Sequence, residues 1–233
     1  MTANAYWTDY FEQVCKDGPA WIDYSNERVQ LQTFGTVLEV ADSLLGRRVL
    51  DIGCGRGALC RLTQLLGATQ ITGVDLASEA LTSLRAEFAG IQWCAGDFTE
   101  PDFRAGLGTF DVIFSLESMQ YLPVPECFDW IFEMLAPGGR FVAMIPYEHC
   151  PIVARTKARF EGKYMPPSLD AIVSWAQANP DATLACRGLG FQADQRIAAY
   201  ASSPWITDPV ATPTWSAPPN RIQLVVQRCG TPS

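Results

Sequence analysis

The chain has 233 residues, of which 48% are hydrophobic and 18% are charged, and its formal net charge at pH 7 is −8. This length suits one globular domain, and a negative charge without any run of basic residues argues against nucleic acid or an anionic membrane surface as partner. The first residues lack the basic start and apolar stretch of a signal peptide, and no apolar run approaches the roughly 18 residues of a membrane span. We therefore expect a cytoplasmic protein.

The first half of the chain alternates between helix and strand patterns. Aromatic residues crowd the first 45 positions, and apolar residues from Val37 to Leu45 recur near helical spacing, which predicts a helix ending at Gly46. We interpret residues 1–45 as a helical, aromatic lid and residues 46–233 as the main domain. Further patterns predict strands at 47–53, 70–75 and 91–95 and helices at 58–66 and 78–88, the latter capped by Ser78.

The second half continues this alternation and then loses it. Strands that alternate with helices indicate a parallel sheet covered on both faces, and hence an α/β fold. The segments 147–167 and 202–219 fit neither pattern, and we interpret them as lid or oligomer-contact segments. The remaining patterns predict a strand at 110–115, a helix reaching Leu135, a turn at Pro137-Gly138-Gly139, a strand at 140–145, a helix at 169–178 and strands at 191–200 and 222–227.

The cysteines do not form a recognisable pattern. Eight of them are scattered along the chain without a Cys-x-x-Cys pair, and the chain has one histidine. This argues against a zinc site, and disulfide frameworks are typical of shorter, secreted chains. We therefore predict reduced thiols and no metal ion.

A glycine-rich turn joins the first predicted strand to the helix after it. Gly53, Gly55 and Gly57 alternate with other residues directly after the apolar strand. Glycine permits positive φ and a close approach of a ligand to the backbone, and the following helix presents free N–H groups to an anion. At the carboxyl ends of parallel strands, this combination predicts a nucleotide-cofactor site.

Acidic residues after three of the strands narrow the choice of cofactor. The spacing Gly-x-Gly-x-Gly differs from the Gly-x-Gly-x-x-Gly of dinucleotide enzymes, and Asp51 before it would repel a pyrophosphate but attract an ammonium group. S-adenosylmethionine fits this requirement because it carries an ammonium group and no phosphate. Asp75 can accept both ribose hydroxyls, Asp97 can accept the adenine amino group, and Phe98 can cover the ring.

Five motifs follow one another in order between Val49 and Pro146. They are Val49-Leu50-Asp51-Ile52-Gly53-Cys54-Gly55-Arg56-Gly57, Gly73-Val74-Asp75-Leu76, Gly96-Asp97-Phe98, Phe110-Asp111-Val112-Ile113-Phe114-Ser115 and Leu135-Ala136-Pro137-Gly138-Gly139-Arg140. Together they resemble the class I S-adenosylmethionine-dependent methyltransferase family. The resemblance implies S-adenosylmethionine as cofactor and a single-domain, Rossmann-like sheet of seven mostly parallel strands, the last of them antiparallel.

The same resemblance supplies the candidate cofactor residues. It implies that Ser115 and Leu116, after the fourth strand, line the methionine end of the cofactor. An aromatic side chain of the lid could also stabilise the sulfonium through a cation–π interaction. The candidate cofactor residues are Tyr24, Asp51, Gly53, Gly55, Gly57, Asp75, Leu76, Asp97, Phe98, Ser115 and Leu116.

The expected chemistry needs little from the protein beyond alignment. A sulfonium methyl group is already activated, but an oxygen or carbon acceptor usually also wants a base for its proton. His149 follows the predicted strand at 140–145, and Glu117 and Tyr121 follow the strand at 110–115, close to where the methyl group should sit. These three are the candidate catalytic residues, with capping, packing or no chemistry as the competing interpretations. A single acidic domain with an aromatic lid favours a small apolar or aromatic metabolite as acceptor, and we expect a monomer or homodimer.

Two other functions stay open at this point. Some proteins that resemble this family cyclise the aminobutyrate chain of the cofactor and release methylthioadenosine, as azetidine-2-carboxylate synthases do, and the lack of an obvious base permits this reaction. The second is an NAD(P)-dependent oxidoreductase. That enzyme would need a pyrophosphate beside Asp51, and the chain contains no Tyr-x-x-x-Lys pair.

Overall fold

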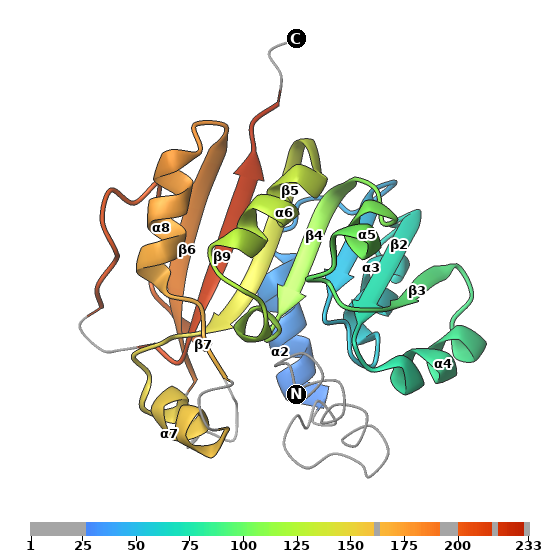
Figure 1. Ribbon diagram of the computed structural model, residues 1–233, viewed down its shortest axis with the longest axis horizontal. Helices are drawn as coiled ribbons and strands as arrows, with labels where there is room; N and C mark the ends of the chain where they lie inside the picture. Colours follow the sequence, from blue (N-terminus) through green and yellow to red (C-terminus); the bar gives the residue numbers. More distant parts are fainter. Residues whose placement is uncertain (1–26, 161–163, 192–199, 216–218, 231–233) are drawn as a thin grey trace.

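One mixed sheet forms the centre of the molecule. The computed structural model describes residues 27–160, 164–191, 200–215 and 219–230. Within them, nine strands lie in the order β3-β2-β1-β4-β5-β9-β6-β7, with β8 paired to β6 (Figure 1). The strands are β1 (Arg48–Ile52), β2 (Gln70–Asp75), β3 (Ile91–Ala95), β4 (Phe110–Leu116), β5 (Leu135–Pro146), β6 (Ala182–Phe191), β7 (Tyr200–Ser202), β8 (Ile206–Thr207) and β9 (Arg221–Arg228).

The direction of the strands agrees with the expected fold. β1 to β5 run parallel to one another, whereas β9 runs antiparallel to both β5 and β6. The seven strands of the expected sheet therefore correspond to β1 to β5, β6 and β9, and the antiparallel last strand is confirmed. β7 and β8 are short additions that pair with β6.

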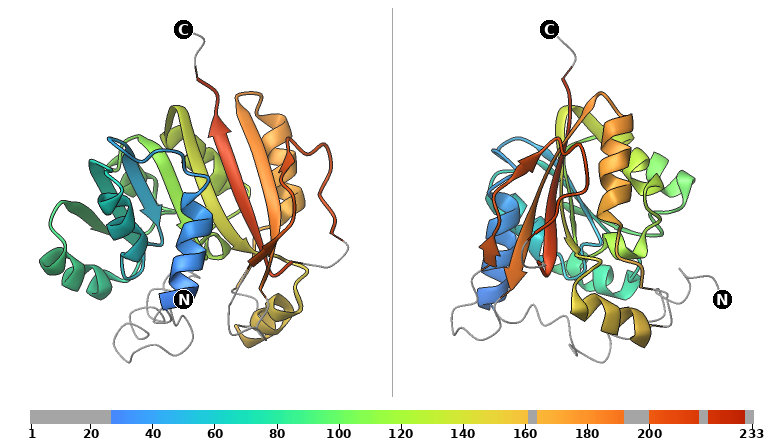
Figure 2. Two further views of the ribbon diagram at one scale, coloured as in Figure 1. Left: turned by 180° about the vertical axis from the view of Figure 1, so that it is seen from behind. Right: turned by 90° about the vertical axis from the view of Figure 1, so that its left-hand side faces the viewer.

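Helices cover both faces of the sheet, as the alternating pattern predicts. Side chains of α2, α3 and α4 belong to one core cluster, and side chains of α6 and α8 belong to the other. Figure 2 shows α2 and α8 on opposite sides of the sheet. The helices are α2 (Glu27–Leu38), α3 (Ala58–Leu65), α4 (Ser78–Glu87), α5 (Pro101–Ala105), the 3-10 turn η1 (Met119–Tyr121), α6 (Glu126–Met134), α7 (Pro151–Arg159) and α8 (Leu169–Ala178).

The central strands are apolar on both faces. Along β4, Ile113 packs into the cluster of α6 and α8, whereas Val112 and Phe114 pack into the cluster of α2, α3 and α4. Successive side chains of a strand point to opposite faces, so a strand covered on both sides reads as a continuous apolar run. This explains why the five parallel strands stand out in the sequence.

Two predicted helix boundaries are wrong. The helix expected to end at Gly46 ends at Leu38. The N–H groups of Val40 and Ala41 then bond to carbonyls three residues earlier, and Asp42 adopts a left-handed φ of 60°. Ala41 and Leu44 are nevertheless buried, so the apolar spacing reflected core packing outside a helix. At α4, Ser78 is the first helical residue and Ala77 occupies the N-cap position.

The strand expected at 191–200 is also misplaced. Its first residue, Phe191, ends β6, and its last, Tyr200, begins β7. Residues 192–199 lie outside the described residues. The strand that pairs with β9 is β6 (Ala182–Phe191), which ends where the expected strand was to begin. It contains Gly188 and Gly190, and glycine usually disfavours strands. Gly188 fits closely there, because an added Cβ would lie 3.0 Å from the side chain of Pro219.

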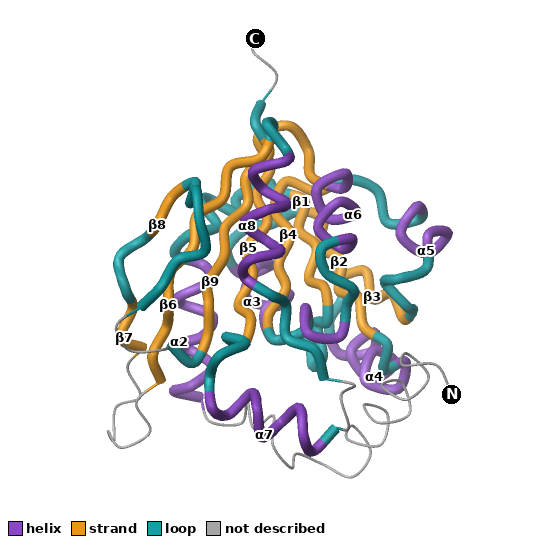
Figure 3. Tube along the Cα trace, turned by 60° about the vertical axis from the view of Figure 1, so that its left-hand side comes forward, coloured by secondary structure: helices purple, strands orange, loops and turns teal. Residues whose placement is uncertain are grey.

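The two segments outside the expected sheet contain regular structure. Segment 147–167 holds α7, which begins at Pro151, and segment 202–219 holds β8. Figure 3 shows α7 lying across the end of the sheet at which β5 ends. Pro137-Gly138-Gly139 lies inside β5, where the pairing with β4 shifts register between Phe110 and Val112.

The described part of the expected lid packs on the sheet. Phe34 and Val37 of α2 are buried in the core, and Gln223 of β9 donates a hydrogen bond to the carbonyl of Thr36 at 2.7 Å. Residues 1–26, including Tyr24, lie outside the described residues. No helix among the described residues is long and apolar enough to cross a membrane.

Candidate active site

The glycine-rich turn has the backbone geometry that its sequence predicts. Gly53, Gly55 and Gly57 have φ of 75°, 52° and 69°. An added Cβ at Gly53 would lie 2.3 Å from the Cβ of Ser118, and one at Gly57 would lie 2.4 Å from the ring of Trp93. At Gly55 it would meet no atom within 4 Å. The open space above the turn is therefore at Gly55.

Asp75 holds this turn in place. Its Oδ2 accepts the N–H of Gly55 at 2.8 Å, and its Oδ1 accepts the N–H of Ala77 at 2.9 Å. Burial raises the pKa of the Asp75 carboxyl above its usual value, and these hydrogen bonds oppose that shift. Each carboxylate oxygen has a second lone pair, so the side chain retains acceptor capacity beside the turn. Leu76, the next residue, packs with partial burial against the core.

Asp51 is a buried acid directly beneath the turn. It is 3% exposed, and its Oδ2 accepts a weak hydrogen bond from the thiol of Cys60 at 3.5 Å. Burial raises the pKa of the Asp51 carboxyl to about 7, the thiol bond opposes this shift, and the charge of Asp75 adds to it. A cation bound nearby would stabilise the charged form, so the site suits a positively charged group.

A chain of hydroxyls ties the end of β4 to the end of β1. Ser118 donates to the carbonyl of Ile52 at 2.6 Å, and the hydroxyls of Ser115 and Ser118 lie 2.5 Å apart. Ser118 has one hydroxyl hydrogen, which it donates to the carbonyl of Ile52, so Ser115 must be the donor to Ser118. Ser115 is thus fully buried and engaged, and Leu116 after it is half-buried.

Asp97 and Phe98 shape the chain after β3. Asp97 Oδ1 accepts both the N–H and the hydroxyl of Thr99, at 2.8 and 2.7 Å. Phe98 is 4% exposed and belongs to the larger core cluster. The expected contacts of these two residues with an adenine ring stay predictions.

Of the three candidate catalytic residues, Glu117 and Tyr121 lie in one short segment after β4. The carboxylate of Glu117 forms an ion pair with Arg221 of β9. Tyr121 packs edge-on against Tyr164, with 6.1 Å between ring centroids. His149 is exposed and packs edge-on against Tyr147, with 5.2 Å between ring centroids.

The sequence did not identify several members of this neighbourhood. Ser118 lies inside the segment that supplied Glu117, but its role depends on a carbonyl 66 residues away. Arg221 lies 104 residues from Glu117, and Tyr164 follows α7. No local pattern marks these residues. The hydrogen bond of Ser118 joins the ends of β4 and β1, and the pairing of β9 with β5 places Arg221 near Glu117.

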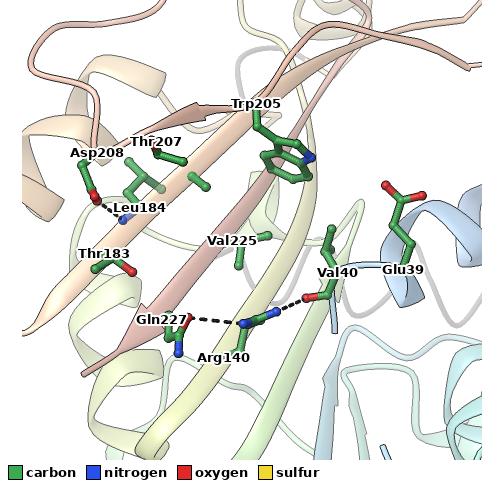
Figure 4. A pocket seen from close by; sticks show the side chains of 11 residues that line it. Glu39, Val40, Arg140, Thr183, Leu184, Trp205, Thr207, Asp208, Val225 and Gln227 are labelled. Carbon is green, nitrogen blue, oxygen red and sulfur yellow. Dashed lines mark hydrogen bonds between the residues drawn. The ribbon is translucent and has the colours of Figure 1, made fainter. Parts of the chain in front are cut away.

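A separate cavity of about 390 Å³ lies far from the turn along the strands. Its wall includes Arg140 near the start of β5, Thr183 near the start of β6 and Gln227 near the end of β9 (Figure 4). This is the amino end of the parallel strands, whereas the glycine-rich turn lies at their carboxyl end. The cavity is therefore distinct from the site around Gly55.

Comparisons with known proteins agree with this geometry. Residues 49–139 match the family described as "Methyltransferase domain". The chain is 39% identical over 107 residues to ubiquinone biosynthesis O-methyltransferase of Vibrio parahaemolyticus, covering 44% of this chain and 45% of that protein. It is 31% identical over 149 residues to the protein of that name from Rhizobium leguminosarum, covering 61% and 58%. The chain thus spans about half the length of these curated relatives.

Solved structures show the same fold. The N-methyltransferase NodS of Bradyrhizobium japonicum, in complex with S-adenosylhomocysteine, superposes with a TM-score of 0.62 at 18% identity, covering 96% of this chain and 98% of that one. A methyltransferase from Anabaena variabilis gives a TM-score of 0.65 at 15% identity, covering 98% and 96%. The fold described above is therefore that of S-adenosylmethionine-dependent methyltransferases.

Proposed function

Because residues 49–139 belong to the class I S-adenosylmethionine-dependent methyltransferase family, we propose that this chain binds S-adenosylmethionine and methylates a hydroxyl group of a small apolar or aromatic metabolite. The choice of an oxygen acceptor is supported by the relatives that are named O-methyltransferases. The two alternatives, an aminobutyrate-cyclising enzyme and an NAD(P)-dependent oxidoreductase, receive no support from these relatives.

One observation carries the cofactor part of the proposal. The turn is open at Gly55, and the N–H of that residue is held from below by Asp75. A ligand can therefore lie directly on the backbone, with its ammonium group near Asp51 and its ribose near Asp75. Leu76, Asp97, Phe98, Ser115 and Leu116 complete the proposed cofactor site, together with Gly53, Gly57 and Tyr24.

The proposed reaction uses the cofactor as a source of an activated methyl group. The protein has to place the acceptor oxygen in line with the carbon–sulfur bond and to accept the proton of the hydroxyl. Glu117 is our first choice for the proton, because it directly follows β4, in the same short segment as Tyr121. His149 is the second choice, since its exposed ring follows β5 and packs against Tyr147.

Mass spectrometry of the purified chain tests the proposal. With S-adenosylmethionine alone we expect an intact bound cofactor, and with a panel of hydroxylated aromatic compounds we expect S-adenosylhomocysteine and a methyl ether. Methylthioadenosine formed without acceptor would replace this function by the cyclisation reaction. A Gly55→Val variant is the control, because its side chain fills the space above the turn, and it should bind no cofactor.

A further inference from the structure

A half-buried ion pair lies at the acceptor end of the proposed site. Nε of Arg221 contacts Oε1 of Glu117, and the side chains are 30% and 23% exposed. Arg221 also donates from Nη1 to the carbonyl of Asn220 at 3.1 Å. Oε2 of Glu117 has no hydrogen-bond partner within the described residues, so it remains able to accept a proton from a ligand.

The backbone holds Glu117 in an uncommon conformation. Its φ is 55°, in the left-handed region that few non-glycine residues adopt. Its N–H donates to the carbonyl of Met144 at 2.9 Å, and its own carbonyl accepts the side-chain amide of Gln120. The neighbouring Ser118 is fixed to β1 through the hydroxyl chain. The carboxylate therefore projects from a rigid support on three strands.

Polar groups beside this ion pair have no partner within the described residues. Tyr164 is 7% exposed, and no hydrogen bond involves its hydroxyl. The amide oxygen of Gln120, a residue that is 4% exposed, is also unpaired. Burial raises the pKa of Tyr164, the charge of Glu117 adds to this shift, and Arg221 opposes it. Tyr164 therefore stays a protonated donor, and the buried, unpaired amide oxygen of Gln120 is an uncommon feature that a ligand or a water molecule can satisfy.

We infer that Arg221 is a positioning residue for the carboxylate of Glu117, that Tyr164 is a specificity residue that donates to the acceptor oxygen, and that the acceptor is a phenol. This inference rests on the proposed methyl transfer. Tyr121 and Tyr164 offer an edge-to-face aromatic wall that suits a planar ring. A phenol also develops negative charge on oxygen, which the Tyr164 hydroxyl and the Arg221 guanidinium stabilise together.

The step balances with the residues that are present. Glu117 accepts the phenolic proton on Oε2 while its Oε1 stays paired with Arg221. The phenolic oxygen forms a bond to the methyl carbon as the carbon–sulfur bond breaks, and the bonding electrons go to sulfur. The products are a methyl ether and neutral S-adenosylhomocysteine, and the proton on Glu117 then passes to water.

Phenols of graded acidity test this assignment. The probes are 4-methoxyphenol, which is protonated near neutral pH, and 4-nitrophenol, which is largely ionised there. For Glu117→Gln and Arg221→Met we expect kcat with 4-methoxyphenol to fall by about 100-fold and about 10-fold respectively, whereas kcat with 4-nitrophenol should change less than threefold. Arg221→Lys should recover part of the loss, and Tyr164→Phe should raise KM for both phenols.

Several outcomes would overturn the inference. An equal loss with both phenols would mean that the ion pair has a structural role only. A wild-type protein that binds S-adenosylhomocysteine but methylates neither phenol would refute the phenolic acceptor and leave the proposed methyl transfer intact. A wild-type protein that binds no S-adenosylhomocysteine would instead refute the proposed function itself. Calorimetric binding of S-adenosylhomocysteine by every variant shows that each one is folded.

Discussion

The carboxylate of Asp75, the last residue of β2, accepts the backbone N–H of Gly55 at 2.8 Å. This bond joins the second strand to the middle of the glycine-rich turn, and a second bond joins Asp75 to the first turn of α4 through Ala77. Asp75 therefore has two roles. It holds the turn on which we propose that the cofactor lies, and it is the residue that we propose for binding the ribose.

Replacing Asp75 should reduce both affinity and stability. Asp75→Ala removes two charge-assisted hydrogen bonds, so we expect a destabilisation of about 1–3 kcal/mol together with at least a tenfold weaker binding of S-adenosylhomocysteine. Asp75→Asn keeps one acceptor oxygen and should lose less of each. Chemical denaturation and calorimetry measure the two effects. Unchanged affinity in Asp75→Ala would place the ribose elsewhere.

Two of the three glycines of the turn, Gly55 and Gly53, should respond differently to alanine. In Gly55→Ala the added Cβ meets open space, and only the left-handed φ is unfavourable, so we expect about 1–2 kcal/mol of lost stability. Because this Cβ would occupy the space proposed for the cofactor, we also expect a large loss of cofactor affinity. Gly53→Ala places its Cβ against Ser118 and should destabilise the fold by about 2–5 kcal/mol. Thermal melting with and without S-adenosylhomocysteine separates the two cases. Tight binding by Gly55→Ala would contradict our placement of the cofactor.

The titration of Asp51 should make cofactor binding depend on pH. Burial raises its pKa to about 7, so below pH 7 the group is neutral in the empty protein and cannot pair with an ammonium group. We expect the affinity for S-adenosylhomocysteine to fall roughly tenfold between pH 8 and pH 6. Binding near pH 7 should release a proton, which calorimetry in buffers of different ionisation enthalpy detects.

The same titration should affect the empty protein in the opposite direction. A carboxyl whose folded pKa is raised contributes stability at pH values below its unfolded pKa, near 4, and loses it as the pH rises toward 7. The empty wild type should therefore gain stability relative to Asp51→Asn as the pH is lowered from 7 to 5. Parallel stability curves for the two proteins would show that Asp51 does not titrate in this range.

His149 offers a test of the choice of base. Its side chain is exposed and contacts the edge of Tyr147, so His149→Gln should change stability by less than about 0.5 kcal/mol. We expect kcat for a phenol to change less than twofold, in contrast to Glu117→Gln. A loss of tenfold or more in steady-state assays would make His149 the base.

Local patterns were sufficient for the cofactor end of the site. The strands β1 to β4 are short and largely apolar, and β5 ends in an apolar run. The turn with Gly53, Gly55 and Gly57 has the positive φ values that its glycines predict. Such features depend on neighbouring residues in the chain, since periodicity and glycine content act over a few positions. The order of the motifs was therefore enough to predict the family and most of the parallel sheet.

Only the tertiary structure determined the end of the site at which we propose that the acceptor binds. β6 was missed because it contains glycines, one of which, Gly188, lies close to Pro219. The helix expected to end at Gly46 ends at Leu38, and the prediction was too long because the buried residues Ala41 and Leu44 continue the apolar spacing outside the helix. The ion pair of Glu117 with Arg221 depends on β9 pairing with β5. These contacts join residues up to 104 positions apart, and the pairing energy that selects them comes from burying whole strands, which no short stretch of sequence expresses.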